Sequence, residues 1–213
     1  MFLKKSLKIR VYNNNLKPYS YSCEVNIKGD NMLTINLEME NLSFEDVTKE
    51  SLEDVLKLYN QNEINIYATG IDRPMSLQDI MQKYLEVLVN SHEFFACIFV
   101  CDPHSFEKKM IGVIKGRIDY DNNEEAWISS ILIDSSFQKN GIGTKVVRSI
   151  IKMLKDTYDI KAILIGILSG NGIGREFWHK MGFNYIRTIE QYIKLNNKNE
   201  DFIIMKKDLK KYP

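Results

Sequence analysis

Trp127 to Leu154 read WISSILIDSSFQKNGIGTKVVRSIIKML, and this stretch decides the fold. Its apolar start, Trp127 to Ile133, predicts a strand, and apolar residues at helical spacing from Val146 to Leu154 predict an amphipathic helix. Between them lies a turn with two glycines, Gly141 and Gly143. Glycines allow successive backbone N–H groups to point inward, and the helix adds the positive end of its dipole behind them. The order strand, glycine turn and helix therefore predicts a site for an anionic ligand.

The spacing of the turn distinguishes between three families of anion-binding loop. A P-loop has a lysine directly after its second glycine, but here Thr144 comes before Lys145. A dinucleotide-binding fingerprint needs a third small residue at the position that Val146 occupies. The remaining pattern, Gln138-x-x-Gly141-x-Gly143, resembles the acyl-coenzyme A loop of the GNAT family of N-acetyltransferases, which is Gln or Arg, two residues, Gly, one residue, and Gly or Ala.

A second block downstream agrees with this resemblance. Residues 161–168 predict a buried strand, and a helix with Ile173, Phe177 and Met181 on one face follows, ending near Gly182. Asn171 in front of this helix, with Phe177-Trp178 inside it, is similar to the second half of the family's signature. A Rossmann-type loop at Gly170-x-Gly172 is the alternative, but Arg175 stands where the third glycine belongs.

The resemblance implies a GNAT acyl-CoA N-acyltransferase fold of α/β class, with a central mixed sheet flanked by about four helices. It implies acetyl-CoA as the acyl donor and a primary amine as the acceptor, either a small molecule or a peptide. The cofactor-binding residues are then expected to be Ile131, Leu132, Ile133, Gln138, Lys139, Asn140, Gly141, Ile142, Gly143, Thr144, Asn171 and Trp178. A backbone N–H of Ile131–Ile133 is expected to stabilise the charge that develops on the carbonyl oxygen.

Composition excludes several classes of partner and site. The 213 residues carry a net charge of +1, which argues against nucleic acid or an acidic membrane as a partner. No apolar run reaches the roughly 18 residues of a membrane span, and the N-terminus lacks the features of a signal peptide. The three cysteines and three histidines show no metal-ligand spacing, so no metal is expected. These observations predict a cytoplasmic protein, with a homodimer as one open possibility.

The chain divides into two expected parts, an N-terminal β-hairpin extension over residues 1–41 and the acetyltransferase domain over residues 42–213. The hairpin has strands at Cys23–Ile27 and Met32–Met39, and an edge extension of the main sheet is favoured over a separate binding module. Within the domain, one helix begins near Thr48 and a second at Ser76. The second is expected to turn Leu77, Ile80, Met81, Tyr84, Leu85 and Leu88 inward.

The catalytic residues stay open at this point. Family members often have carboxylates where this chain has Ser129 and Ser130, and a tyrosine general acid where it has Trp178. Candidate bases are Glu63, Asp72, Glu124, Glu125, Glu190 and Tyr192, and water relayed through Ser129 is an equal alternative. Trp178 is expected to pack or to contact the pantetheine arm, because an indole N–H is far too weak an acid.

The acceptor site is expected at the polar, irregular segment Gln61–Met75 between the first two helices. Glu63 or Asp72 suits a cationic amine and Arg73 suits a carboxylate, so small amines, amino acids and protein amines all remain open. Two further functions are alternatives to acetyl transfer: a non-catalytic acyl-CoA-binding or sensing module, and transfer of a longer acyl chain.

Overall fold

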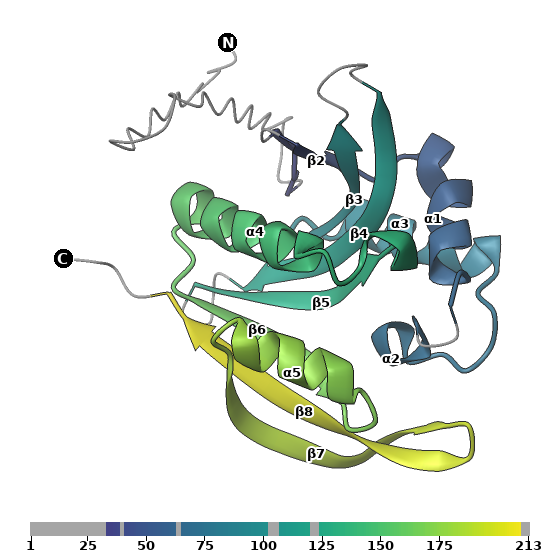
Figure 1. The fold of residues 1–213 in the computed structure, drawn as a ribbon, viewed down its shortest axis with the longest axis vertical. Coiled ribbons are helices and arrows are strands. Elements are labelled where there is room, and N and C mark those ends of the chain that lie inside the picture. Colours follow the sequence, from purple (N-terminus) through teal and green to yellow (C-terminus); the bar gives the residue numbers. More distant parts are fainter. Residues whose placement is uncertain (1–32, 39–40, 63–64, 102–106, 120–123, 210–213) are drawn as a thin grey trace.

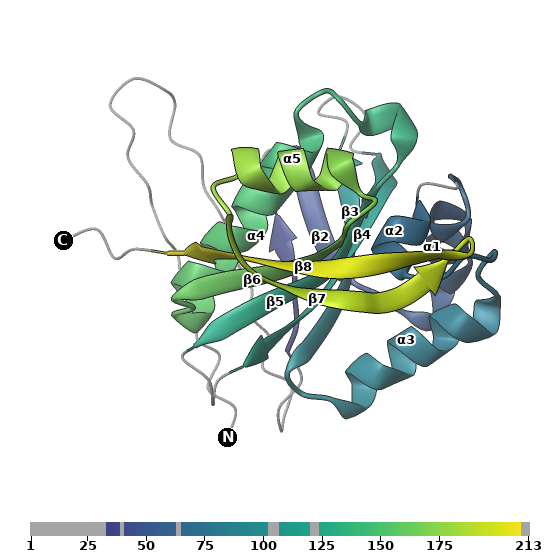
Figure 2. The ribbon, with the colours of Figure 1, turned by 90° about the horizontal axis from the view of Figure 1, so that it is seen from below.

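The computed structural model describes residues 33–38, 41–62, 65–101, 107–119 and 124–209, which form one mixed sheet with helices on both faces (Figures 1 and 2). The sheet has eight strands in the spatial order β1-β2-β3-β4-β5-β6-β8-β7. They are β1 (Leu37–Glu38), β2 (Leu42–Asp46), β3 (Glu93–Cys101), β4 (Lys108–Asp119), β5 (Glu125–Ile133), β6 (Ala162–Leu168), β7 (Asn184–Leu195) and β8 (Lys198–Asp208). The expected mixed α/β class is confirmed.

In the described part of the chain, four helices cover the sheet and a fifth, very short one lies at its side. They are α1 (Leu52–Tyr59), α2 (Ile66–Thr69), α3 (Leu77–Val89), α4 (Ile142–Tyr158) and α5 (Gly172–Lys180), with 3-10 turns at Lys49–Ser51 and Ser135–Phe137. The segment Gln61–Met75 was expected to be irregular, but it contains the single turn α2. No helix in the described ranges combines the length and apolarity that crossing a bilayer requires.

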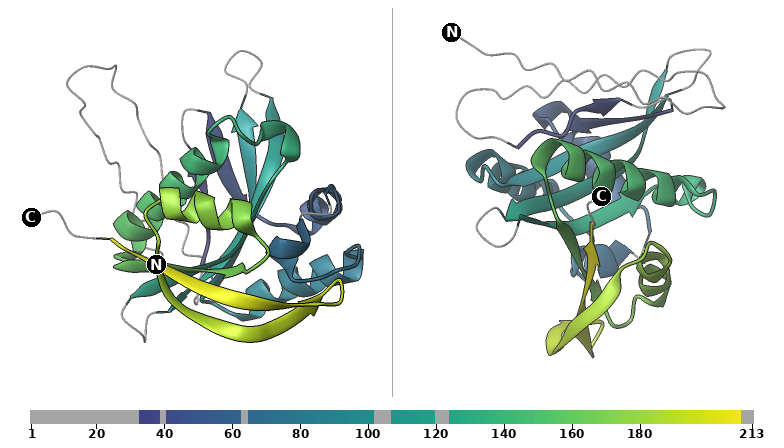
Figure 3. Two further views of the ribbon diagram at one scale, coloured as in Figure 1. Left: turned by 60° about the horizontal axis from the view of Figure 1, so that its bottom comes forward. Right: turned by 90° about the vertical axis from the view of Figure 1, so that its left-hand side faces the viewer.

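Two hydrophobic clusters hold the helices against opposite faces. Val146, Val147, Ile150 and Leu154 of α4 join Trp178 of α5 in the larger cluster. The smaller cluster joins side chains of α1 and α3 to β3, β4 and β5. In α4 the predicted apolar stripe is confirmed, because these four residues are all fully buried. Figure 3 shows that α4 and α5 lie on the same side of the strands.

The stripe expected for the second helix is wrong at three positions. In α3 only Ile80 and Val87 are buried, while Leu77, Leu85 and Leu88 are 40–48% exposed. Ile80 and Val87 lie seven residues apart, which places them on one narrow stripe of the helix. Sequence spacing predicted a wider apolar face than this helix uses against the sheet.

The face predicted for the helix after β6 is wrong at one position, Ile173, and right at Phe177 and Met181. Ile173 is 73% exposed, and the buried residue within α5 is Trp178. The helix has only nine residues, and its C-terminal half alone packs on the larger cluster through Phe177, Trp178 and the following Met181. Gly182, with φ of +84°, ends it as expected.

The N-terminal hairpin lies largely outside the described residues, including its first strand and its turn. Within the described part, Leu33, Ile35 and Leu37 are buried in the larger cluster. β1 pairs with β2, with Leu37 opposite Phe44. This segment therefore extends the edge of the main sheet, and the division of the chain at residue 41 stays a prediction.

Candidate active site

The site begins where two neighbouring strands separate. β5 and β6 form the parallel pair of the sheet, and their pairing ends at Ile128 opposite Ile165. β6 continues along β8, with Gly166 opposite Ile204, while β5 continues along β4. A cavity of about 600 Å³ lies at this opening, lined by both strands, by Asn171 just before α5 and by Trp178 within it.

A bulge in β5 marks the same point. Lys115 of β4 lies opposite Ser130 and the next residue, Gly116, lies opposite Ile128, so Ser129 is an extra residue without an opposite partner. Ser129 is exposed and lines the cavity. A bulge bends its strand and redirects the backbone next to it, which here turns β5 away from β6.

Beyond the bulge, β5 directs backbone N–H groups into the opening. The N–H of Asp134 donates to the carbonyl of Ile111 at 2.7 Å, toward β4. Hydrogen-bonding groups alternate between the two edges of a strand, so the N–H groups of Ile131 and Ile133 face away from β4, toward the opening. The same alternation directs the N–H of Leu132 at β4, and its side chain is buried in the smaller cluster.

The glycine turn follows directly and leads into α4. Gly141, with φ of +76°, takes the N-cap position, and a side chain built at this residue meets no atom within 4 Å. None of the N–H groups of residues 139–144 donates to another residue in the described part of the chain. Free N–H groups at the first turn of a 17-residue helix have the geometry and the dipole that suit an anion.

The side chain of Gln138 stabilises the turn through a hydrogen bond to the end of β5. It donates to the carbonyl of Ile133 at 2.7 Å, which ties the end of β5 to the loop. Gly143 lies against α5, since a Cβ built there comes to 3.7 Å from the ring of Phe177. The turn and α5 are thus in contact, although about 30 residues separate them in the chain.

The structure places ten of the twelve expected cofactor-binding residues in two groups. Ile131, Asn171 and Trp178 line the cavity, and Gln138–Thr144 lie beyond it at the start of α4. Leu132 and Ile133, at the end of β5, belong to neither group. The side chain of Asn171 caps α5 by accepting from the N–H of Gly174 at 2.8 Å. The ring of Trp178 makes edge contacts with Phe177 and Phe183, with centroids 5.1 and 4.9 Å apart.

A buried carboxylate holds the loop that carries Asn171. Glu200 of β8 is 8% exposed, and it accepts hydrogen bonds from the hydroxyl of Ser169 at 2.7 Å and from the N–H of Gly170 at 2.6 Å. Hydrogen bonds of this kind, to an ionised acceptor, are the stronger class. Glu200 therefore positions the β6–α5 loop.

Few of the candidate bases lie near the cavity. Glu124 pairs with Lys161, and Glu125 pairs with Lys206 at 2.7 Å. Asp72 accepts from the N–H of Asn196 at 3.2 Å, and Glu190 is exposed on β7. Glu63 lies outside the described residues. Of the described candidates, only Tyr192 and the alternative relay residue Ser129 line the cavity.

Tyr59, the last residue of α1, is a buried group next to the site. Its hydroxyl hydrogen-bonds the side chain of Ser130, next to the bulge. Burial raises the pKa of Tyr59 to about 12, so this hydroxyl stays protonated at neutral pH. Tyr59 therefore presents a neutral hydroxyl group to the side chain of Ser130.

Another part of the cavity wall comes from α2 and the β7–β8 hairpin, which lie side by side (Figure 1). A Cβ built at Gly70 lies 3.5 Å from the side chain of Ile193, and Asp72 bonds the hairpin turn at Asn196. The ring of Phe202 covers Gly166, and Tyr192 stacks on Phe202 with centroids 4.7 Å apart.

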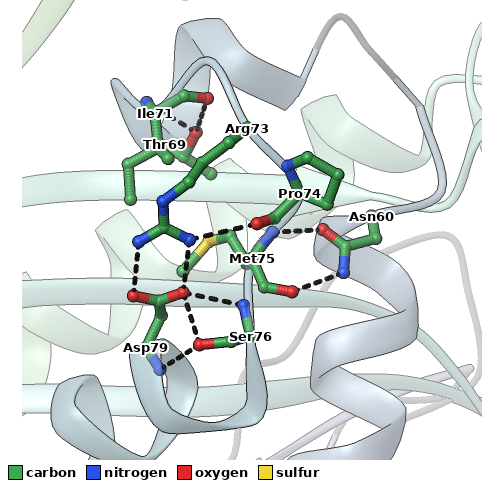
Figure 4. A network of polar contacts seen from close by, with 8 residues as sticks. All are labelled: Asn60, Thr69, Ile71, Arg73, Pro74, Met75, Ser76 and Asp79. Atoms are coloured by element: carbon green, nitrogen blue, oxygen red, sulfur yellow. Dashed lines mark hydrogen bonds and ion pairs between the residues drawn. The ribbon is translucent and has the colours of Figure 1, made fainter.

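Figure 4 shows what braces the base of the segment Gln61–Met75. The side chain of Asn60 bonds both the N–H and the carbonyl of Met75, at 2.8 and 2.9 Å. Arg73 donates two hydrogen bonds to Asp79, at 2.8 and 2.9 Å, and these hold the pKa of that carboxyl well below its usual range. Arg73 is thereby engaged in the scaffold, and it is not among the residues that line the cavity.

Several lining residues had no place in the sequence-based site. They are Arg117, Arg187, Ile189, Ile193, Phe202 and Ile204, from β4, β7 and β8. No motif marks them, since they come together only through the curvature of the sheet. In the sequence, alternating segments near Tyr185–Leu195 and Phe202–Lys206 predict two final strands, which is the one signal that bears on the residues from β7 and β8.

Comparison with known proteins identifies related sequences and folds. Residues 45–204 match the family model described as "Acetyltransferase (GNAT) domain". Spermine/spermidine N(1)-acetyltransferase of Bacillus subtilis is 29% identical over 68 residues, which cover 32% of this chain and 45% of that protein. The chain thus spans under half the length of this relative.

Solved structures show the same fold at low sequence identity. A spermidine N-acetyltransferase from Vibrio cholerae, solved with CoA and spermine, has a TM-score of 0.66 at 16% identity, covering 80% of this chain and 96% of that one. A probable GNAT-family acetyltransferase from Chromobacterium violaceum has a TM-score of 0.69 at 10% identity, covering 84% and 88%. Identities this low establish the fold alone.

Proposed function

The chain belongs to the GNAT acetyltransferase family, and from this premise we propose that it transfers an acetyl group from acetyl-CoA to a primary amine by direct attack on the thioester. GNAT acetyltransferases use acetyl-CoA as their acyl donor. The observation that carries the proposal is the opening of the sheet after Ile128 and Ile165, with free amides at both of its ends. The N–H groups of the turn at residues 139–144 suit a pyrophosphate, and the N–H groups of Ile131 and Ile133 suit a carbonyl oxygen.

The donor side fits this cosubstrate residue by residue. The N–H groups of Lys139–Thr144 hold the pyrophosphate at the start of α4. Asn171 and Trp178, on the cavity wall, contact the pantetheine arm. The N–H of Ile131 faces the opening and stabilises the charge that develops on the thioester oxygen, with Ile133 next to it. Leu132 contributes through packing, because its side chain is buried on the other face.

The amine must lose a proton before it attacks. An alkylammonium has a pKa of about 10, so roughly one part in a thousand is neutral at pH 7. No lining carboxylate is present among the described residues, and Ser129 is exposed at the bulge. Water hydrogen-bonded to Ser129 therefore relays this proton to bulk solvent. The sulfur leaves as a thiolate without a general acid, because the thiol pKa of about 8.5 limits the penalty at pH 7 to roughly 2 kcal/mol.

A thiol-release assay tests the proposal. The protein is incubated with acetyl-CoA and a panel of polyamines, amino acids and peptides, and free CoA is measured against hydrolysis without acceptor. Turnover with any amine supports acetyl transfer. Calorimetric binding of acetyl-CoA without turnover across the panel instead favours the sensing module, although the relatives named above are acetyltransferases. Longer acyl-CoA donors in the same assay measure acyl-chain preference.

The remaining expectations concern the setting of the enzyme. A cytoplasmic location and a homodimer stay predictions, which fractionation and light scattering of the purified protein test. The long exposed edge strand β7 is the surface at which a second copy can be sought first.

A further inference from the structure

We propose, on the basis of the proposed function, that the acceptor is a primary amine that also carries a carboxylate, bound by Arg117 and Arg187. Both arginines line the cavity, and its described lining contains no Asp, Glu, Lys or His. The described part of the lining therefore carries a formal charge of +2, which repels a polyamine and attracts an acceptor with an anionic group.

The two arginines are free to bind an anion, unlike the lysines near them. Within the described residues, neither Arg117 nor Arg187 forms an ion pair. Lys115, two residues before Arg117, pairs with Glu86 and Glu93, and Lys206 pairs with Glu125. The charges around the cavity are thus neutralised locally, and those inside it are not.

The strand register directs both arginines to the same face. Arg117 lies opposite Trp127, and its guanidinium carbon is 5.8 Å from the centre of that ring. Arg187 lies opposite Ile204, which lies opposite Gly166. Directly opposite residues share a face of the sheet. Arg117 therefore lies on the same face as Trp127, and Arg187 lies on the same face as Ile204, and both of these partners line the cavity. The arginines lie on opposite sides of the opening. Arg117 is on β4, the neighbour of β5, and Arg187 is on β7, three strands from β5 in the other direction.

Neutral aromatic side chains form the walls between the arginines. Tyr67 of α2 and the stacked pair Tyr192 and Phe202 all line the cavity. Tyr192 is 55% exposed and both arginines are exposed as well, so an acceptor can enter from solvent, and its carboxylate can form charge-assisted hydrogen bonds with the guanidinium groups. The planar guanidinium group also binds a carboxylate in bidentate geometry, which gives the site its specificity for that group.

Two charged residues of the segment Gln61–Met75, Arg73 and Asp72, were expected to bind the acceptor, but both already have partners. Arg73 is paired with Asp79, and Asp72 is hydrogen-bonded to Asn196. The anion-recognising groups therefore come from β4 and β7.

The test compares acceptors that differ only in the carboxylate. We measure kcat/KM by thiol release for L-amino acids, for the amines that their decarboxylation yields, and for spermine. The variants are Arg117→Gln, Arg187→Gln and the double variant, with Arg148→Gln as control, because Arg148 is exposed on α4 and does not line the cavity. Equilibrium binding of acetyl-CoA is measured for each variant.

The parent is expected to prefer a carboxylated acceptor over its decarboxylated partner. This ratio should fall about tenfold or more in an Arg117 or Arg187 variant, because a hydrogen bond to a charged group is lost, and stay unchanged in Arg148→Gln. Acetyl-CoA affinity should be retained throughout. Turnover led by spermine, or a ratio that neither arginine variant changes, overturns this inference and leaves the proposed function standing. Acetyl-CoA binding with no turnover of any amine contradicts the proposed function itself, and the inference with it.

Discussion

The two halves of the proposed site are built from different groups. The proposed donor half consists of backbone N–H groups in one stretch of chain, from the end of β5 into α4, together with Asn171 before α5 and Trp178 within it. The acceptor half consists of side chains from β4, α2, β7 and β8, which are far apart in sequence. A thioester and a pyrophosphate are constant ligands that backbone can bind, whereas an acceptor is recognised by whichever side chains line its half.

The largest expected effect is on the donor half, in Gly141→Asp. A carboxylate about 5 Å from a pyrophosphate charge costs roughly 3 kcal/mol at an effective dielectric of about 20, over a hundredfold in acetyl-CoA affinity. Gly141 has a φ of +76°, so any side chain there also adds about 1–2 kcal/mol of strain. Isothermal titration and melting curves measure the two effects separately.

Gly141→Asn is the matched control. It has nearly the same shape and backbone strain without the charge, so its melting temperature should equal that of the aspartate variant. If both variants lose affinity equally, strain and not charge is responsible. If both keep the parent's affinity, the pyrophosphate binds elsewhere.

Gly166→Ala should damage the acceptor half and spare the donor half. Its methyl group overlaps the ring of Phe202, and forcing this ring aside is expected to cost about 1–3 kcal/mol of unfolding free energy. The acceptor KM should rise while the Kd for acetyl-CoA stays near that of the parent. Gly172→Ala is the control, since its Cβ meets nothing within 4 Å. An unchanged acceptor KM would mean that Phe202 does not shape the acceptor site.

Glu200→Gln tests the link between the halves, because β8 holds the loop of Asn171. The charged hydrogen bonds to Ser169 and Gly170 are weakened, which is expected to cost about 1–2 kcal/mol and a few-fold in acetyl-CoA affinity. Chemical denaturation and titration measure these changes. Glu190→Gln on exposed β7 provides the comparison; equal stability of the two variants would show that the buried carboxylate contributes nothing.

The smallest expected effect at neutral pH belongs to Tyr59→Phe, which removes the hydrogen bond to Ser130 and about 1 kcal/mol. The folded pKa of about 12 lies above the value of about 10 in an unfolded chain, so the parent's tyrosine contribution is complete below pH 10 and is lost as the pH rises to 12. Denaturation at pH 8, 10 and 11 should show a steeper alkaline loss in the parent than in Tyr59→Phe. Tyr192→Phe, at an exposed position, should follow the parent.

Much of the fold could be predicted from local pattern. The strand ending at Ile133, the helix with Val146 and Leu154 inside, and the glycine stop at Gly182 each depend on neighbours along the chain. The predictions were wrong where a helix contacts the sheet with part of its apolar surface, as at Leu85 and Ile173. Periodicity shows that a face is apolar, but the partner's shape decides how much of it is covered.

The sequence by itself determined the family and predicted the donor half, because a glycine turn at the start of a helix is a local backbone property carried by neighbouring residues. Only the tertiary structure decided the acceptor half. Whether Arg117 and Arg187 face a cavity, and whether Arg73 is free, depends on strand register and on ion pairs between distant residues. Contacts between residues that are distant in sequence do not appear in the hydrophobic pattern, because either partner can be substituted without changing the pattern around it.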